Sequence, residues 1–217
     1  MTRDRDTRVL RELVGTHGET FAQEAGITLK DTPQPLYRLL VLAVLLSARI
    51  RGSVAVATAR ALSDAGLRDP RRMAGSDWQE RVDALGRGGY RRYDERTATQ
   101  LGDGAGLVAG RWGGDLRRLR EEAHGEVSAL RGLLREVPGL GPAGADIFLR
   151  EVQRVWPEVA PYLDGKALSG ARRLGLPEDP GRLVELAGDT EPAVLAAALV
   201  RAALDRHVAE ECLEHVA

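Results

Sequence analysis

Apolar residues recur at helical spacing along almost the whole chain of 217 residues, and no other feature limits the choice of fold as strongly. Residues 8–25 follow this spacing, and Leu36–Ala48 is apolar nearly all round, which is typical of a central buried helix. No stretch of four to eight residues alternates convincingly between apolar and polar side chains, so we expect no sheet. The pattern therefore predicts an all-α protein.

Turn residues divide the rest of the chain into further predicted helices. These lie near residues 54–65, 77–85, 96–108, 116–122, 128–136, 143–155, 181–187 and 192–215, with another after Asp164. Asp115 is expected to be the N-cap of the helix through Glu122, because an Asp side chain accepts a backbone hydrogen bond in the first turn. Leu36–Ala48 is too short to span a bilayer, which needs about twenty residues, and the charged N-terminal segment has no apolar core. We therefore expect a soluble, cytoplasmic protein.

Cysteine content and charge exclude several kinds of protein. The single cysteine, Cys212, excludes an internal disulfide and any metal site made of cysteines alone. The 31 basic and 32 acidic residues exclude a binder that is strongly cationic as a whole. Residues 49–93 nevertheless hold ten arginines and five acidic residues, whereas residues 178–217 hold nine acidic residues and three arginines. This asymmetry indicates a face that meets an anion, although solvated helix faces would explain it as well.

The segment Leu133–Phe148, LLREVPGLGPAGADIF, predicts two helices joined by a tight turn. Gly139 and Gly141 can adopt positive φ, and neither has a side chain that blocks a close approach. The second helix presents free N–H groups at its start, where a phosphate can bind. This pattern is that of a helix-hairpin-helix, which binds the DNA backbone without reading sequence, or of an ordinary turn between two helices. The expected contacts are Pro138, Gly139, Leu140, Gly141, Ala143 and Gly144.

Three separated segments are informative as a set. They are LLVLAVLLSARIRGSV at Leu39–Val54, VPGLGPAGA at Val137–Ala145 and YLDGK at Tyr162–Lys166. In this order they resemble the helix-hairpin-helix–Gly/Pro–Asp superfamily of DNA glycosylases, which includes endonuclease III and the A/G-mismatch adenine glycosylases. The resemblance implies a helical barrel over residues 36–157, with the helix-hairpin-helix at about 128–155, and a second helical domain made of residues 1–35 together with 158–217. It also implies a monomer in the bacterial cytoplasm, associated with the nucleoid, that binds double-stranded DNA containing a lesion.

Asp164 is the candidate catalytic carboxylate. Breaking an N-glycosidic bond builds positive charge at the sugar C1′, which a neighbouring carboxylate stabilises, and the base must first leave the stack. The resemblance places the family's Asp at Asp164, where it would stabilise the sugar, position the attacking water, or both. Asp164 is also suited to cap the helix that starts at Gly165, and the two roles are compatible.

Departures from the family pattern limit which reactions and cofactors we expect of this protein. The lyase-active branch has a Lys after the hairpin that attacks C1′, and the corresponding position here is Ala143. Lys166 is the substitute candidate for that nucleophile, with a phosphate contact or an ion pair with Asp164 as alternatives. Cys212 alone cannot hold the four-iron cluster of endonuclease III relatives, so we expect no cofactor, with a monovalent cation at the hairpin as a possible exception. The Glu that adenine-glycosylase relatives use as an acid is absent near Ala43, which is apolar.

Two further segments are candidates for DNA contact. Arg49 follows LLSA, where endonuclease III relatives carry a Gln that enters the gap left by the flipped base, and a phosphate contact or a surface Arg is the alternative. The loop of residues 86–96 adds Arg87, Tyr90, Arg91, Arg92 and Tyr93. Tyrosines beside arginines offer stacking surfaces next to positive charge, although either Tyr could instead anchor the loop to the core.

The function that the resemblance implies is that of a monofunctional DNA glycosylase, which hydrolyses the bond of a flipped damaged or mismatched base with Asp164. A non-catalytic binder of distorted DNA is the first alternative, favoured by the missing Lys and the apolar position near Ala43. A glycosylase with lyase activity through Lys166 is the second.

Overall fold

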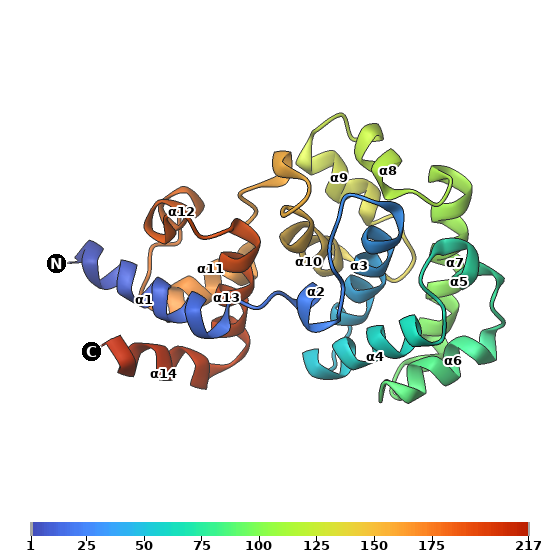
Figure 1. The fold of residues 1–217 in the computed structure, drawn as a ribbon, viewed down its shortest axis with the longest axis horizontal. Coiled ribbons are helices and arrows are strands. Elements are labelled where there is room, and N and C mark those ends of the chain that lie inside the picture. Colours follow the sequence, from blue (N-terminus) through green and yellow to red (C-terminus); the bar gives the residue numbers. More distant parts are fainter. Residues whose placement is uncertain (1, 217) are drawn as a thin grey trace. The chain divides into compact units, whose positions relative to one another are not determined.

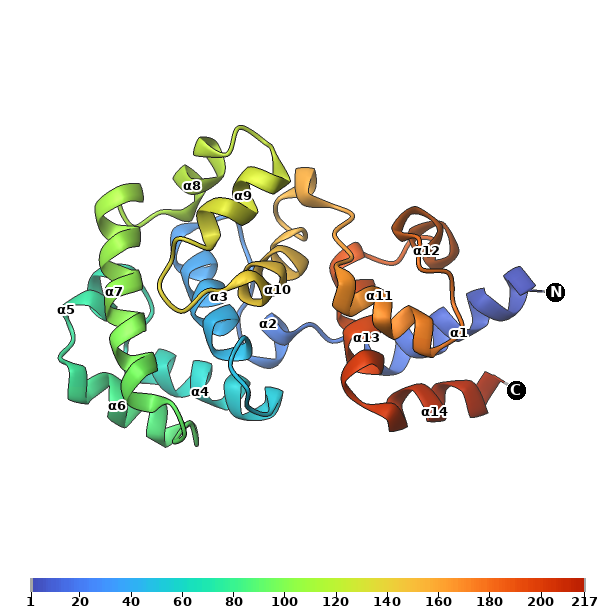
Figure 2. The same cartoon turned by 180° about the vertical axis from the view of Figure 1, so that it is seen from behind.

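All regular secondary structure in residues 2–216, the part of the chain that the computed structural model describes, is helical (Figures 1 and 2). No strand occurs within this range, so the predicted all-α fold class is confirmed. The chain forms two compact units, one made of Met1–Phe21 with Arg150–Ala217 and the other of Ala22–Leu149. None of the helices in residues 2–216 is long and apolar enough to cross a membrane.

The unit Ala22–Leu149 is built around one apolar helix. Its helices are α3 (Pro33–Leu46), α4 (Gly52–Asp64), α5 (Pro70–Gly75), α6 (Trp78–Arg87), α7 (Asp94–Trp112), α8 (Leu116–Glu122) and α9 (Val127–Leu134), followed by most of α10 (Pro142–Val152). Pro33 starts α3, since proline needs no hydrogen-bond acceptor in a first helical turn. Leu36, Leu39 and Leu42 of α3 are all fully buried, because neighbours such as α4 and α8 pack around it.

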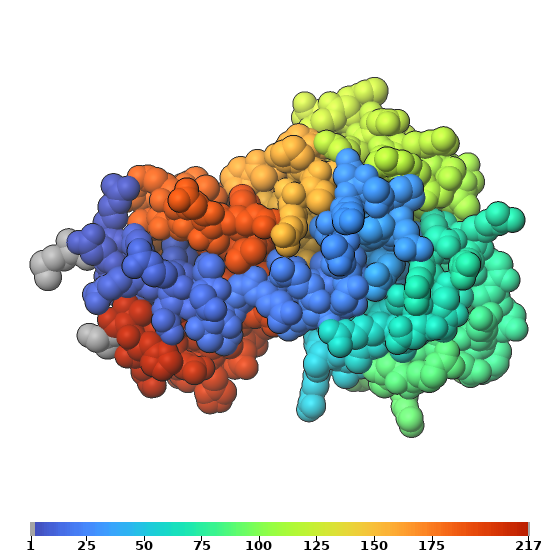
Figure 3. Space-filling model, viewed as in Figure 1, coloured from blue at the N-terminus to red at the C-terminus, as the bar shows by residue number. Residues whose placement is uncertain are grey.

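The second unit combines both ends of the chain. Its helices are α1 (Thr2–His17), the 3₁₀ helix Pro157–Val159, α11 (Gly165–Arg173), α12 (Pro180–Ala187), α13 (Pro192–Leu204) and α14 (Arg206–Val216). The apolar α13 is the core, and α11 crosses it so closely that a Cβ at Gly170 would lie 1.9 Å from the Leu199 carbonyl oxygen. α1 and α14 lie against each other, visible as the blue and red segments in Figure 3, and the Cys212 thiol donates to the Val9 carbonyl at 3.4 Å.

The borders between the two units differ from the predicted borders at 35/36 and 157/158. The first lies at residues 21/22, since residues after it join the larger unit: the Arg60 and Arg38 side chains donate to the carbonyls of Glu24 and Gly26. The second lies at residues 149/150 because the last turns of α10 bond to the segment that precedes α11. Short polar contacts of this kind leave no periodic signal in the sequence.

Two long predicted helices are each broken in the structure. The helix expected over residues 8–25 ends at His17, and the short helix α2 (Phe21–Glu24) follows it. The break lies at Gly18, where the chain turns so tightly that a Cβ would lie 2.5 Å from the Val14 carbonyl oxygen. The helix expected over residues 192–215 is interrupted at Asp205, whose side chain accepts the His207 N–H at 2.9 Å and begins α14. Asp115 caps α8 as predicted, accepting the Arg117 N–H at 3.0 Å.

Candidate functional site

The predicted hairpin is formed by α9, α10 and the turn of residues 135–141 between them. Gly139 adopts a positive φ of 86°, whereas Gly141 does not, so the left-handed conformation expected of the two glycines occurs at one of them. A Cβ at Gly139 would lie 3.2 Å from side-chain atoms of Gln100 and Val44. This turn therefore needs glycine both for its backbone conformation and for its close packing on α7 and α3.

Leu140, one of the predicted hairpin contacts, is buried in the structure. Its side chain is 1% exposed, and its N–H donates to the Val137 carbonyl at 3.0 Å. Both groups are therefore engaged within the protein, and the contact of Leu140 with DNA stays a prediction that this geometry does not favour. Leu140 instead anchors the turn, because a Cβ at Gly144 would lie 2.8 Å from its side chain.

The exposed end of the hairpin is the first turn of α10. Gly141 and Ala143 are exposed, Pro138 and Gly139 are half-buried, and Gly144 is buried. Pro142 has no N–H, and the N–H groups of the next two residues have no acceptor within the helix because they lie in its first turn. This end can therefore bind an anion through backbone groups.

Two contacts hold the hairpin in place. Arg131 of α9 donates to both carboxylate oxygens of Asp146 in α10, at 2.6 and 3.2 Å, which ties the two helices together. Ser47, in the segment after α3, donates to the Val44 carbonyl at 2.7 Å and lies 3.4 Å from the Gly139 carbonyl oxygen. The structure thus brings together two of the three segments that carry the family resemblance.

Arg49 lies at a pocket of about 360 Å³ in the unit Ala22–Leu149. The other lining residues are Val44, Ser47, Ala48, Tyr90, Tyr93, Arg96, Thr97, Gln100 and Gly139. The pocket therefore joins Arg49 to the turn of the hairpin and to the loop that precedes α7. Arg96, which is exposed and places a second guanidinium beside this pocket, was not among the predicted site residues.

The loop between α6 and α7 spans residues 88–93, shorter than the predicted 86–96. Tyr90 is 2% exposed and its hydroxyl lies 3.0 Å from Thr97 Oγ1. This geometry favours the alternative in which Tyr90 anchors the loop over a role in stacking on DNA. Burial raises the pKa of Tyr90. Tyr93 is half-buried, with the Arg92 guanidinium 5.3 Å from its ring centre.

Arginines without a carboxylate partner gather in this part of the sequence. They are Arg49, Arg87, Arg91, Arg92 and Arg96, all exposed, and none of them forms an ion pair with any residue that the structure describes. In the other unit, Arg172, Arg182 and Arg206 each pair with a glutamate. The positive charge near the pocket is therefore free to meet an external anion, whereas these arginines of the other unit are neutralised internally.

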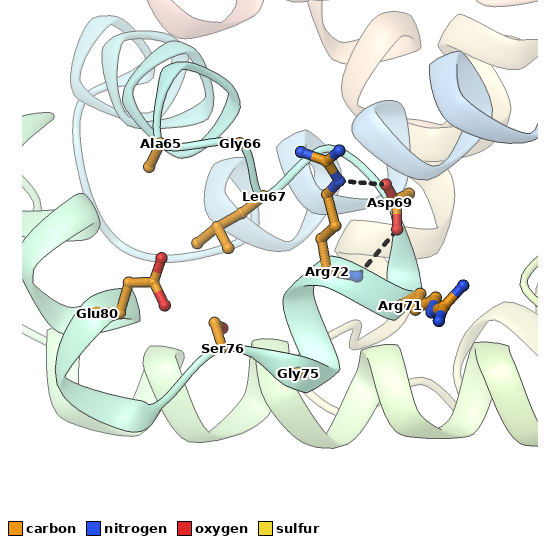
Figure 4. A pocket seen from close by; sticks show the side chains of 9 residues that line it. All are labelled: Ala65, Gly66, Leu67, Asp69, Arg71, Arg72, Gly75, Ser76 and Glu80. Carbon is orange, nitrogen blue, oxygen red and sulfur yellow. Dashed lines mark hydrogen bonds and ion pairs between the residues drawn. The ribbon is translucent and has the colours of Figure 1, made fainter.

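A second hollow, of about 670 Å³, lies beside the short helix α5 (Figure 4). Asp69 caps this helix by accepting the Arg72 N–H at 2.9 Å, and the Arg72 side chain lies 3.6 Å from the same carboxylate. Arg71 points away from the hollow, while Leu67 lies at its wall. Asp69 and Arg72 thus neutralise each other, and none of the predicted site residues lines this hollow.

Asp164 is the N-cap of α11, as predicted. Its Oδ1 accepts the Ala167 N–H at 3.2 Å. Its main partner is Arg150 of α10, whose Nη1 lies 2.9 Å from Oδ1 and 2.9 Å from Oδ2. Both side chains are largely buried, with 9% of Arg150 and 12% of Asp164 exposed. Lys166 is exposed and forms no ion pair with Asp164, so the ion-pair interpretation of Lys166 is wrong.

Gln153 holds the segment that leads to Asp164. It is 4% exposed, its Nε2 donates to the carbonyls of Arg150 and Tyr162 at 2.9 and 3.2 Å, and its Oε1 accepts the Tyr162 N–H at 2.7 Å. Sequence reasoning missed both Arg150 and Gln153. No signal in the sequence singles them out, because four of the seven residues 149–155 are polar: Arg150, Glu151, Gln153 and Arg154.

The chain does not fit the iron–sulfur site that the resemblance to endonuclease III implies. Cys212 is its single cysteine, is 2% exposed, and donates to a backbone carbonyl within its own unit. Burial raises the pKa of its thiol. Across residues 2–216 no three His, Cys, Asp or Glu side chains are grouped so that they could hold a metal ion. Ala43, near the place where the resemblance to adenine glycosylases would put a catalytic Glu, is fully buried in α3.

The helical fold of the chain is of the endonuclease III type. It matches the solved structure of a trapped endonuclease III–DNA covalent intermediate, an estranged-adenine complex, with a TM-score of 0.55, over 92% of this chain and 85% of that chain. The two sequences are 16% identical, so this likeness establishes the fold. No protein-family model matches the sequence, and no curated protein matches it significantly.

Proposed function

We propose that this protein is a monofunctional DNA glycosylase that acts on lesion-containing double-stranded DNA as a monomer, without a cofactor. The observation that carries this proposal is Asp164, a largely buried carboxylate fixed at the start of α11 in a fold of the endonuclease III type. A carboxylate held in this way can stabilise the positive charge that develops at C1′ when a glycosidic bond breaks.

DNA binding in this proposal uses backbone contacts more than base contacts. The first turn of α10 offers N–H groups to a phosphate, and the exposed arginines around the pocket supply positive charge. Arg49 is the candidate for the gap that a flipped base leaves, because it lines the pocket next to Gly139. These contacts position the duplex and do not identify the lesion.

The chemical step is hydrolysis. The oxygen of a water forms a bond to C1′, and the C1′–N bond breaks with its electron pair leaving on the base. The water proton passes to Asp164, and the base takes a proton from solvent. The resemblance aligns Ala143, which is exposed, with the nucleophile of the lyase-active branch, and a methyl group cannot form a Schiff base.

The test is a panel of duplexes, each with one lesion or mismatch, incubated with the protein and developed with and without alkali. Hydrolysis leaves an abasic site, so a monofunctional glycosylase produces strand breaks only after alkali. Breaks without alkali, together with borohydride trapping that Lys166→Ala abolishes, would instead support a lyase. Absence of breaks in both lanes across the panel contradicts the proposal.

A non-catalytic binder of distorted DNA is the second candidate, and Arg150 is the observation that favours it. Its guanidinium lies 2.9 Å from both oxygens of Asp164 and offsets the negative charge that catalysis needs. This candidate predicts tight binding to lesion-containing duplexes in the same panel, with no base release from any of them.

A further inference from the structure

The two oxygens of the Asp164 carboxylate are not equivalent. Oδ1 accepts two hydrogen bonds, from Arg150 Nη1 at 2.9 Å and from the Ala167 N–H at 3.2 Å. Oδ2 accepts one, from the same Arg150 nitrogen at 2.9 Å. Because each carboxylate oxygen has two lone pairs, Oδ1 is saturated by these donors and Oδ2 keeps one acceptor position.

We infer that Arg150 is a positioning residue, which fixes the Asp164 carboxylate so that Oδ2 is the oxygen that receives the proton of the attacking water. This inference rests on the function proposed above and adds a residue to it. The backbone cap from Ala167 holds one oxygen only, so the carboxylate could still turn about its last bond. The Arg150 guanidinium contacts both oxygens and removes this freedom.

Arg150 is itself held in a way that suits this role. Its side chain is 9% exposed, and Asp164 is its one ion-pair partner among the residues that the structure describes. Its backbone carbonyl accepts the Gln153 amide, which also donates to the Tyr162 carbonyl two residues before Asp164. The Gln153 amide therefore links the backbone at Arg150 to the segment that carries Asp164, independently of the ion pair between the two side chains.

The inference predicts a loss of rate with little loss of DNA affinity. We expect Arg150→Ala to lower the single-turnover rate of base release by about 10- to 100-fold, since a small misplacement of a reacting group has an effect of this size. The dissociation constant for the same lesion duplex should stay within about twofold, because the buried guanidinium is not a phosphate contact. Arg150→Lys should retain an intermediate rate, since an ammonium donates to the carboxylate but lacks the planar guanidinium.

Chemical rescue separates positioning from a merely structural role. The Arg150→Ala variant loses a buried guanidinium, so millimolar guanidinium ion should restore part of its rate. The same addition should not restore Asp164→Asn. The matched control is Arg154→Ala, four residues further on, where the Arg is 42% exposed and pairs with Glu191 at 3.3 Å. This control should keep the wild-type rate and should not respond to guanidinium.

Three results would overturn the inference. The first is an Arg150→Ala variant with the wild-type rate, and the second is a variant whose defect lies in DNA affinity alone. The third is a slow variant that guanidinium does not rescue and whose thermal midpoint has fallen, which indicates a structural role. A wild-type protein that releases no base from any duplex overturns the proposed function, and the inference with it. An active wild type with an equally active Arg150→Ala overturns the inference alone.

Discussion

At the scale of single residues, the Asp164–Arg150 pair is the feature that joins folding to the proposed chemistry. Burying two charges is costly unless each is paired and hydrogen-bonded, and both conditions are met here. The position of Asp164 could be predicted from the YLDGK segment and its resemblance to the family. Arg150 could not, because it lies 14 residues earlier in a helix whose other positions already explain its pattern.

The burial of Tyr90 predicts how the stability of the fold depends on alkaline pH. Burial raises the pKa of Tyr90, so at alkaline pH the unfolded state loses the tyrosine proton near pH 10 while the folded state retains it. The free energy of unfolding should therefore fall as the pH rises above about 10. Tyr90→Phe should cost about 1 kcal/mol at pH 8, where the hydrogen bond to Thr97 is lost.

Urea denaturation at pH 8 and again at about pH 11 checks this prediction. The difference between wild type and Tyr90→Phe should shrink at the higher pH, because the variant lacks one of the groups that destabilise the fold there. An equal difference at both values would show that Tyr90 titrates normally and is not buried in solution.

At the scale of elements, periodicity predicted most helices but not their ends. The apolar helix at Leu36–Ala48 and the hairpin helices were visible because their apolar positions repeat. The short α5, Pro70–Gly75, was missed, since six residues are too few for a repeat and an Asp side chain supplies its start. The breaks at Gly18 and Asp205 depend on packing and on a local cap, which interrupt a helix without changing its apolar pattern.

The crossing of α11 and α13 gives a prediction for an element. Gly170→Ala should destabilise the fold by about 2–4 kcal/mol, because its Cβ would lie 1.9 Å from a backbone oxygen of α13 and the helices must separate. Base release should fall as well, since Asp164 caps α11. Thermal and urea denaturation measure the first effect, and single-turnover assays the second.

Gly132→Ala in α9 is the matched control for this substitution. No atom lies within 4 Å of the position that a Cβ would take at Gly132, so the alanine should stabilise the helix by about 0.5–1 kcal/mol. A Gly170→Ala variant as stable as Gly132→Ala would contradict the close approach of α11 to α13.

At the scale of the whole molecule, the net charge of −1 does not reveal how the arginines available for the proposed DNA binding are distributed. The uneven charge was visible in the sequence, but which arginines are free was not, because pairing depends on neighbours far apart in the chain. Arg111, for example, pairs with Glu122 and Glu136, whereas Arg49 and Arg91 are exposed with no carboxylate partner among the described residues.

This distribution predicts which arginines set the salt dependence of DNA binding. The double variant Arg87→Ala/Arg91→Ala should make the plot of log K against log salt less steep by about 2, close to one for each lost phosphate contact. The control Arg182→Ala/Arg206→Ala removes two arginines that pair with Glu185 and Glu210, and should leave the slope unchanged. Fluorescence anisotropy at several salt concentrations measures both, and equal slopes for the two double variants would contradict the assignment.

The central claim is that Asp164 performs the chemistry, and the single-turnover rate of Asp164→Asn tests it most directly. Asn keeps the cap on α11 but carries no charge, so base release should be abolished while DNA affinity is largely retained. Asp179→Asn, at the N-cap of α12, is the matched control and should react at the wild-type rate. Base release by Asp164→Asn at a rate close to that of the wild type would remove Asp164 from the mechanism.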